Sequence, residues 1–140
     1  DGRLVGTVRL WHVTAGPGRQ ALLLGPLAVA PEAQGRGIGA ALMTHALKAA
    51  RRSGAAAVIL VGDAPYYGRF GFSAEKTAAL WMPGPYEQSR LLAVEFTAGA
   101  LDGAHGLVGA SGKPEPKPSL AQLISGLKPA RRRARLPQAA

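Results

Sequence analysis

Apolar and polar residues alternate along residues 3–13, which is the period-two pattern of a β-strand whose faces meet different surroundings. The turn dipeptide Asp1–Gly2 precedes this segment, so we expect the chain to start inside a hairpin. One face of the predicted strand carries Val5, Thr7, Arg9, Trp11 and Val13, and the other carries Leu4, Val8, Leu10 and His12.

A second strand is predicted over residues 21–30, where the run ALLLGPLAVA is almost entirely apolar. Such a run is typical of a strand that is buried on both faces. Gly25 and Pro26 interrupt the run. Because proline has no N–H to donate to a neighbouring strand, we expect a local distortion at this point.

The pattern then changes to helical spacing. Ile38, Leu42, Ala46 and Ala49 predict a helix over residues 40–52, preceded by the glycine-rich turn QGRGIG. A short apolar strand is predicted over residues 55–61, and a short helix around the aromatic cluster that follows it. Further strands are predicted over residues 72–80 and 90–97. This order of elements favours an α/β or α+β sheet domain.

Composition divides the chain into a core, residues 1–110, and an extension, residues 111–140, that is rich in proline, lysine and arginine. The net charge of +9 is mainly a property of the extension, since residues 113–140 hold seven Lys or Arg and one Glu. The run Arg131–Arg135 could bind nucleic acid. A solvated tail is the favoured interpretation, because no aromatic residue lies near it to stack on bases.

The chain contains no cysteine, which excludes disulfides, thiolate metal sites and a cysteine nucleophile. A reducing, cytoplasmic setting fits this composition. No run of 18 apolar residues occurs, so we expect a soluble protein without a membrane segment. We expect no metal site.

The segment from Leu24 to Leu42 has the order strand, glycine-rich turn, helix, which suits phosphate binding. Glycines let the backbone approach a ligand closely, and the first amides of the helix point at an anion. The same residues also fit the dinucleotide pattern G-x-G-x-x-G/A, through Gly35, Gly37 and Ala40. That alternative is weaker, because Pro31–Gln34 separate the strand from the first glycine.

This segment resembles the GNAT acetyltransferase superfamily, whose signature Q/R-x-x-G-x-G/A is matched by Gln34, Gly37 and Gly39. Downstream, Tyr67–Phe72 looks like the family element Y-x-x-x-G-F. The resemblance covers residues 1–109 and is greatest to a bacterial branch of predicted N-acetyltransferases. It implies the GNAT acyl-CoA N-acyltransferase fold, a mixed, mostly antiparallel sheet flanked by helices.

The resemblance also implies a function, namely transfer of an acetyl group from acetyl-CoA to a primary amine by direct attack, without an acyl-enzyme. It implies that Tyr67 is the general acid, and that backbone groups bind the co-substrate. The implied pantetheine strand is Leu27, Ala28 and Val29, and the implied pyrophosphate turn is Gln34, Gly35, Arg36, Gly37, Ile38, Gly39 and Ala40.

Two departures from the family pattern keep alternatives open. Leu60 stands where many members have an asparagine that contacts CoA, and the family's first strand, first two helices and second strand have no counterpart before Asp1. We therefore expect a truncated product, and a non-catalytic acyl-CoA-binding or sensor module remains an alternative. A nucleic-acid adaptor is a weaker one.

Several points stay open at this stage. The general base is unassigned among His12, Glu87, Glu95 and water, and the amine acceptor and homodimer formation are undetermined. Tyr67 could instead be a core aromatic. Met82, together with Trp81, lines an acceptor pocket or covers a core edge, and the second interpretation is slightly favoured.

Overall fold

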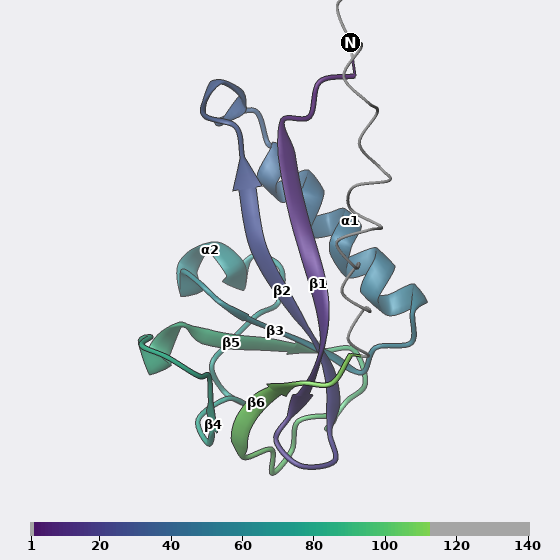
Figure 1. Cartoon of the computed structure of the whole chain (residues 1–140), viewed down its shortest axis with the longest axis vertical. Helices are drawn as coiled ribbons and strands as arrows, with labels where there is room; N and C mark the ends of the chain where they lie inside the picture. Colours follow the sequence, from purple (N-terminus) through teal and green to yellow (C-terminus); the bar gives the residue numbers. More distant parts are fainter. Residues whose placement is uncertain (1, 113–140) are drawn as a thin grey trace, which may run out of the picture.

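A computed structural model of the chain describes residues 2–112, which form one six-stranded sheet with two α-helices and two short 3-10 helices. The strands lie in the order β4-β6-β1-β2-β3-β5 (Figure 1). The strands are β1 (Gly6–Ala15), β2 (Gln20–Val29), β3 (Ala57–Val61), β4 (Leu80–Trp81), β5 (Leu91–Glu95) and β6 (Gly106–Ala110), and the helices are η1 (Pro31–Ala33), α1 (Ile38–Arg52), α2 (Ala64–Gly68) and η2 (Gln88–Arg90).

The sheet is mixed and mostly antiparallel, as predicted. β1 pairs antiparallel with both β2 and β6, and β3 pairs antiparallel with β5. β2 and β3 pair in parallel, as do β4 and β6. The predicted α/β class is therefore confirmed.

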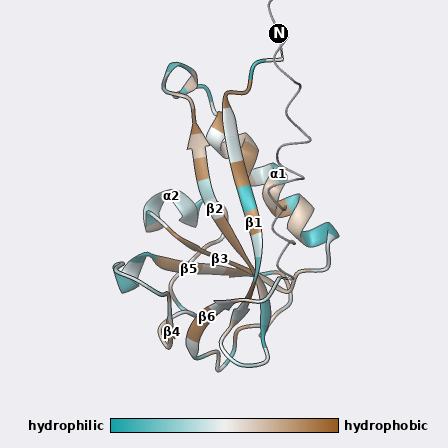
Figure 2. Cartoon of the chain, viewed as in Figure 1, coloured by the Kyte–Doolittle hydropathy of each residue, from teal (hydrophilic) through white to brown (hydrophobic). Residues whose placement is uncertain are grey.

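Two apolar clusters cover the two faces of the sheet, because alternate residues of a strand point to opposite sides. In β3, Val58 and Leu60 join the cluster under α1, whereas Ala57 and Ile59 join the cluster on the opposite face. Figure 2 shows the apolar colour along β3 and along β5, the edge strand that pairs with it. The first cluster also holds Leu22, Leu24, Met43, Ala46, Ala50, Phe72 and Leu92, and the second holds Val13, Ala15, Ala21, Leu80, Leu91, Ala93, Leu101, Ala104 and Val108.

The alternation predicted for the first strand is confirmed, although the strand begins at Gly6 rather than at residue 3. Val8 and Leu10 pack against the cluster under α1, and Val13 is buried on the other face. β1 pairs with β2 over most of its length but meets β6 only from Val13 to Ala15. Over the rest of β1, the second edge has no strand partner among residues 2–112.

The distortion predicted at Gly25 and Pro26 is a β-bulge. Val8 lies opposite Leu27 and Leu10 lies opposite Leu24, so Arg9 alone faces the two residues Gly25 and Pro26. The Trp11 indole Nε1 donates a hydrogen bond to the Gly25 carbonyl oxygen over 2.6 Å. This bond links β1 to the bulge.

The prediction of a strand over residues 72–80 is wrong. That segment is a series of turns, with one isolated bridge between Ser73 and Ala93 before β4 begins at Leu80. The buried Thr77 hydroxyl donates to the Leu91 carbonyl over 2.6 Å, and Gln88 Nε2 donates to the carbonyls of Thr77 and Leu80. Side chains thus satisfy the backbone groups that a strand would pair.

Other boundaries differ by small amounts. α1 starts at Ile38, two residues earlier than predicted, and β6 was not predicted at all because its sequence GLVGA gives little strand signal. No helix within the described residues is long and apolar enough to cross a membrane. The predictions for the run Arg131–Arg135 lie outside these residues.

Candidate functional site

The parallel strands β2 and β3 separate soon after they meet. β2 and β3 are paired only at Leu22 with Val58 and at Leu23 with Ile59, and Figure 1 shows them diverging beyond that point. The bulge at Gly25 and Pro26 follows directly. From the bulge to Val29, the edge of β2 that faces away from β1 has no strand partner in the described part of the chain. Such an edge can pair with an extended ligand.

The glycine-rich turn joins the end of this edge to α1. Gly35 and Gly37 have φ values of 78° and 77°, in the left-handed region that glycine adopts most readily. Gly37 is the N-cap of α1, and no described side chain accepts from the first amides of the helix. The first turn contains no Asp or Glu. The positive end of α1 is therefore open to an anion.

A hollow of about 300 Å³ lies over these amides. Arg69 is the one charged residue among the ten that line it, so the wall carries positive and no negative charge. Gln34 Nε2 donates to the Val29 carbonyl oxygen over 3.3 Å, which ties the turn to the end of β2. The lining residues are Val29, Ala33, Gln34, Gly35, Gly37, Ile38, Gly39, Ala40, Tyr66 and Arg69.

The structure brings together most of the residues that the sequence predicts for phosphate binding. Arg36 is exposed and does not line the hollow, and Leu27 and Ala28 lie along the unpartnered edge of β2. Tyr66 and Arg69 were missed. They are three residues apart, the spacing that puts two side chains on one helix face, and the guanidinium of Arg69 lies 5.5 Å from the Tyr66 ring centroid.

The short helix α2 sends its two tyrosines to different places. Asp63 caps α2 by accepting a hydrogen bond from the Tyr66 amide over 3.3 Å. The Tyr66 hydroxyl reaches the glycine turn, since a Cβ built on Gly39 would lie 3.3 Å from it. The Tyr67 ring instead lies on Gly62, at the end of β3, and packs against the cluster under α1.

Tyr67 is half-buried, and within residues 2–112 its hydroxyl makes no hydrogen bond. Burial raises the pKa of this hydroxyl, the neighbouring Tyr66 and Asp63 raise it further, and Arg90 opposes them. Tyr67 therefore keeps its proton at neutral pH. A partly accessible, protonated phenol can act as a proton donor.

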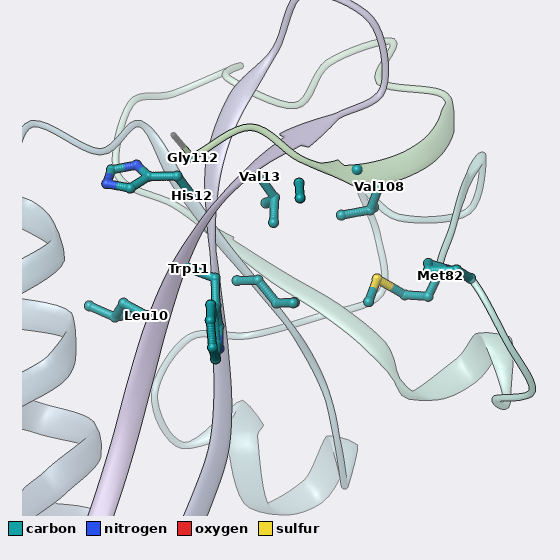
Figure 3. A pocket seen from close by; sticks show the side chains of 11 residues that line it. Leu10, Trp11, His12, Val13, Met82, Val108 and Gly112 are labelled. Atoms are coloured by element: carbon teal, nitrogen blue, oxygen red, sulfur yellow. The ribbon is translucent and has the colours of Figure 1, made fainter. Parts of the chain in front are cut away.

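A second hollow, of about 620 Å³, lies on the sheet face opposite α1. Met82 contributes to its wall but Trp81 does not. Figure 3 shows the side chains of Trp11, Val13, Met82 and Val108 around this space, whereas His12 points away from it. The wall is formed by Leu10, Trp11, His12, Val13, Leu23, Met82, Pro83, Val108, Gly109, Ala110 and Gly112.

Of the open candidates for the base, Glu95 has a structural partner. Its carboxylate accepts a hydrogen bond from the Leu101 amide over 2.8 Å. His12 is turned away from the second hollow, and Glu87 is exposed next to η2. The contacts of the described residues single out none of the three as a base.

A comparison with protein families identifies the domain. The family model described as "Acetyltransferase (GNAT) domain" matches residues 1–74. The chain belongs to the GNAT acetyltransferase family. It is 31% identical over 109 residues to the uncharacterized N-acetyltransferase YhbS of Escherichia coli K12. That match covers 77% of this chain and 65% of YhbS, so the chain spans about two thirds of the length of this relative.

Solved structures agree with the GNAT assignment. The crystal structure of YhbS from Escherichia coli in complex with CoA has a TM-score of 0.69 and 29% identity, over 79% of this chain and 62% of that one. A GNAT acetyltransferase from Brucella melitensis in complex with acetyl-CoA has a TM-score of 0.60 and 30% identity, over 79% and 61%. Both of these related structures hold CoA or acetyl-CoA.

Proposed function

We propose that this GNAT chain is an N-acetyltransferase that uses acetyl-CoA and acts on a primary amine. The observation that carries the proposal is the separation of β2 from β3 after Leu23, beside a turn whose helix amides are uncapped. An extended, partly peptide-like arm would pair with the edge from Leu27 to Val29. The pyrophosphate would lie over the turn from Gln34 to Ala40.

The residues around the turn suit this ligand. The lining of the smaller hollow is free of carboxylates, and Arg69 adds a guanidinium that is held beside Tyr66. Arg36 is an exposed residue of the turn that does not line the hollow, so its charge would attract the pyrophosphate from a distance. An acidic group in this position would instead repel a pyrophosphate.

Acetyl-CoA supplies a thioester that a neutral amine attacks directly. A carbon–nitrogen bond forms and the carbon–sulfur bond breaks. The amine loses one proton to water, and the Tyr67 hydroxyl gives one to the departing sulfur and regains it from solvent. Backbone amides of the β2 edge would stabilise the charge that develops on the carbonyl oxygen. Tyr67 suits this role better than Tyr66, whose hydroxyl lies at the glycine turn.

An acyl-CoA-binding module is the second candidate. It is favoured by Leu60, which is 1% exposed in the cluster under α1 and offers no polar group to a ligand. Binding of acetyl-CoA would then occur without transfer. The two functions share the same site and differ only in product formation.

The test follows the release of free CoA thiol with a thiol reagent. The chain has no cysteine, so the protein itself contributes no background. The proposal predicts thiol release that depends on added amine, and an acetylated amine in equal amount by mass spectrometry. Calorimetric binding of acetyl-CoA, with no product from any amine in a broad panel, would favour the binding module.

A further inference from the structure

The larger hollow has an apolar interior. Trp11, Val13, Met82 and Val108 face its space in Figure 3, while Leu10 and His12 point to the other side of the strand. The volume of about 620 Å³ is in the range of small-molecule sites. Trp11 is 46% exposed, and an exposed aromatic at the edge of such a hollow is a common ligand anchor.

This hollow lies next to the point where the strands separate. Leu23 lines it and is also the last residue of β2 that pairs with β3. Trp11 lines it and donates its hydrogen bond to Gly25, in the bulge that begins the unpartnered edge. A molecule in the hollow would therefore sit at the start of the edge assigned to the pantetheine arm.

The hollow contains no carboxylate that would pair with a buried ammonium. None of its eleven lining residues is Asp, Glu, Lys or Arg, and the one titratable side chain, His12, points away. Arg9 adds positive charge nearby, since its guanidinium lies 5.7 Å from the Trp11 ring centroid. A second ammonium on a bound molecule would lose its hydration without gaining a carboxylate partner, and Arg9, which already lies over the Trp11 ring, would repel it.

We infer that this hollow binds the amine acceptor, and that the acceptor is a monoamine with an apolar alkyl or aromatic body rather than a polyamine or an amino sugar. The inference rests on the proposed acetyl transfer. It also explains how the amine could lose its proton although no general base has been assigned. Apolar surroundings disfavour the charged form of the acceptor's own amino group, which leaves more of the neutral nucleophile without a carboxylate.

A homologous series of linear alkylamines tests the inference. We expect kcat/KM to rise by about fourfold or less for each methylene added, because that is the factor given by burying one methylene. A diamine of the same length as hexylamine should be at least about tenfold poorer, since its second ammonium is unpaired. A flat series, or a preference for the diamine, would overturn the inference while acetylation itself stands.

Variants connect this selectivity to the hollow. Met82→Ala should flatten the chain-length dependence, because it removes part of the apolar wall without touching the Trp11–Gly25 hydrogen bond. The matched control is Leu107→Ala, a residue of β6 that is 56% exposed and does not line the hollow. Equal effects of the two variants would contradict the assignment.

A binding measurement separates this inference from the proposed reaction. The chain has two tryptophans, so Trp81→Phe leaves Trp11 as the sole reporter. With CoA present, hexylamine should change the Trp11 emission saturably, at concentrations about tenfold or more below those of the diamine. Binding without acetylation would support the hollow and contradict the transfer. Emission that responds to neither amine would overturn the inference.

Discussion

The ring of Tyr67 lies on the α-carbon of Gly62, so closely that a Cβ built there would come within 2.3 Å of Tyr67 Cε2. The backbone of Gly62 is fixed from the other side. Its amide donates to the Arg90 carbonyl over 2.9 Å, and Arg90 Nε donates to the Gly62 carbonyl over 3.3 Å. Because the backbone is held, any side chain at Gly62 must displace the ring. Gly62 therefore determines where the Tyr67 hydroxyl lies.

Gly62→Ala should lower the turnover number strongly while the chain stays folded. Misplacing a reacting group by about 1 Å can cost about 100-fold in rate, so we expect a loss approaching that size. The matched control is Gly68→Ala in α2, where a Cβ would meet open space. Steady-state kinetics and thermal unfolding of both variants check this. Normal turnover of Gly62→Ala would mean that the ring position does not matter.

Tyr67→Phe removes the hydroxyl and keeps the ring. Loss of a general acid typically costs about 100-fold or more, so kcat should fall by at least that factor if proton donation limits turnover. The calorimetric affinity for CoA should stay unchanged. Stability should change little, because the hydroxyl makes no hydrogen bond within the described residues. Tyr66→Phe is the control, and it should affect CoA affinity more than kcat. If the chemical step limits turnover and Tyr67→Phe still turns over at the normal rate, Tyr67 is not the general acid.

The raised pKa of Tyr67 gives a pH prediction. Burial is the main cause, and it moves the pKa above the ordinary value of 10.0. Any fall in kcat caused by loss of the Tyr67 proton should therefore be centred above pH 10.0. Any Tyr67 contribution to stability is likewise retained below this pH and lost above it. The alkaline decline in kcat should be absent in Tyr67→Phe. A decline centred near pH 8 that the variant abolishes would contradict the raised pKa.

Gly39→Ala should change affinity and stability in opposite directions. A Cβ at Gly39 would lie 3.3 Å from the Tyr66 hydroxyl and would fill part of the smaller hollow, so CoA should bind more weakly. Alanine is the better helix former by up to about 1 kcal/mol, so the free energy of unfolding should hold or rise. The control is Ala41→Gly, at an exposed position of α1 outside the hollow, which should lower the free energy of unfolding and leave CoA affinity unchanged. Calorimetry and denaturant unfolding measure both. Unchanged CoA affinity in folded Gly39→Ala would remove this position from the site.

The parts of the fold that local chemistry determines could be predicted from the sequence. The bulge at Gly25 and Pro26 could be predicted because proline has no backbone N–H to donate to the next strand. The turn before α1 could be predicted from the order of strand, glycine-rich segment and helix. The strand predicted over residues 72–80 does not form, because the conformation of this segment depends on contacts with residues distant in sequence. Thr77 is buried because its hydroxyl reaches Leu91, a contact that no local pattern indicates.

The site could be predicted only in part, for the same reason. The backbone groups of the glycine turn are adjacent in sequence, so the sequence pattern was enough to predict the turn. Arg69 reaches that turn only because the segment after β3 brings α2 beside the start of α1. The larger hollow combines Trp11 of β1 with Met82 after β4 and Val108 of β6, three segments that only the sheet order brings together.

The most direct test of the central claim follows a radiolabelled acetyl group from acetyl-CoA. The chain is incubated with labelled acetyl-CoA and hexylamine, and the label is then separated into amine product, protein and unreacted thioester. Direct transfer predicts labelled N-acetylhexylamine in the same amount as the released CoA thiol, with no label on the denatured protein and no product from Tyr67→Phe on the same time scale. Label retained covalently on the protein, or thiol released without labelled amine, would contradict direct transfer to an amine at this site.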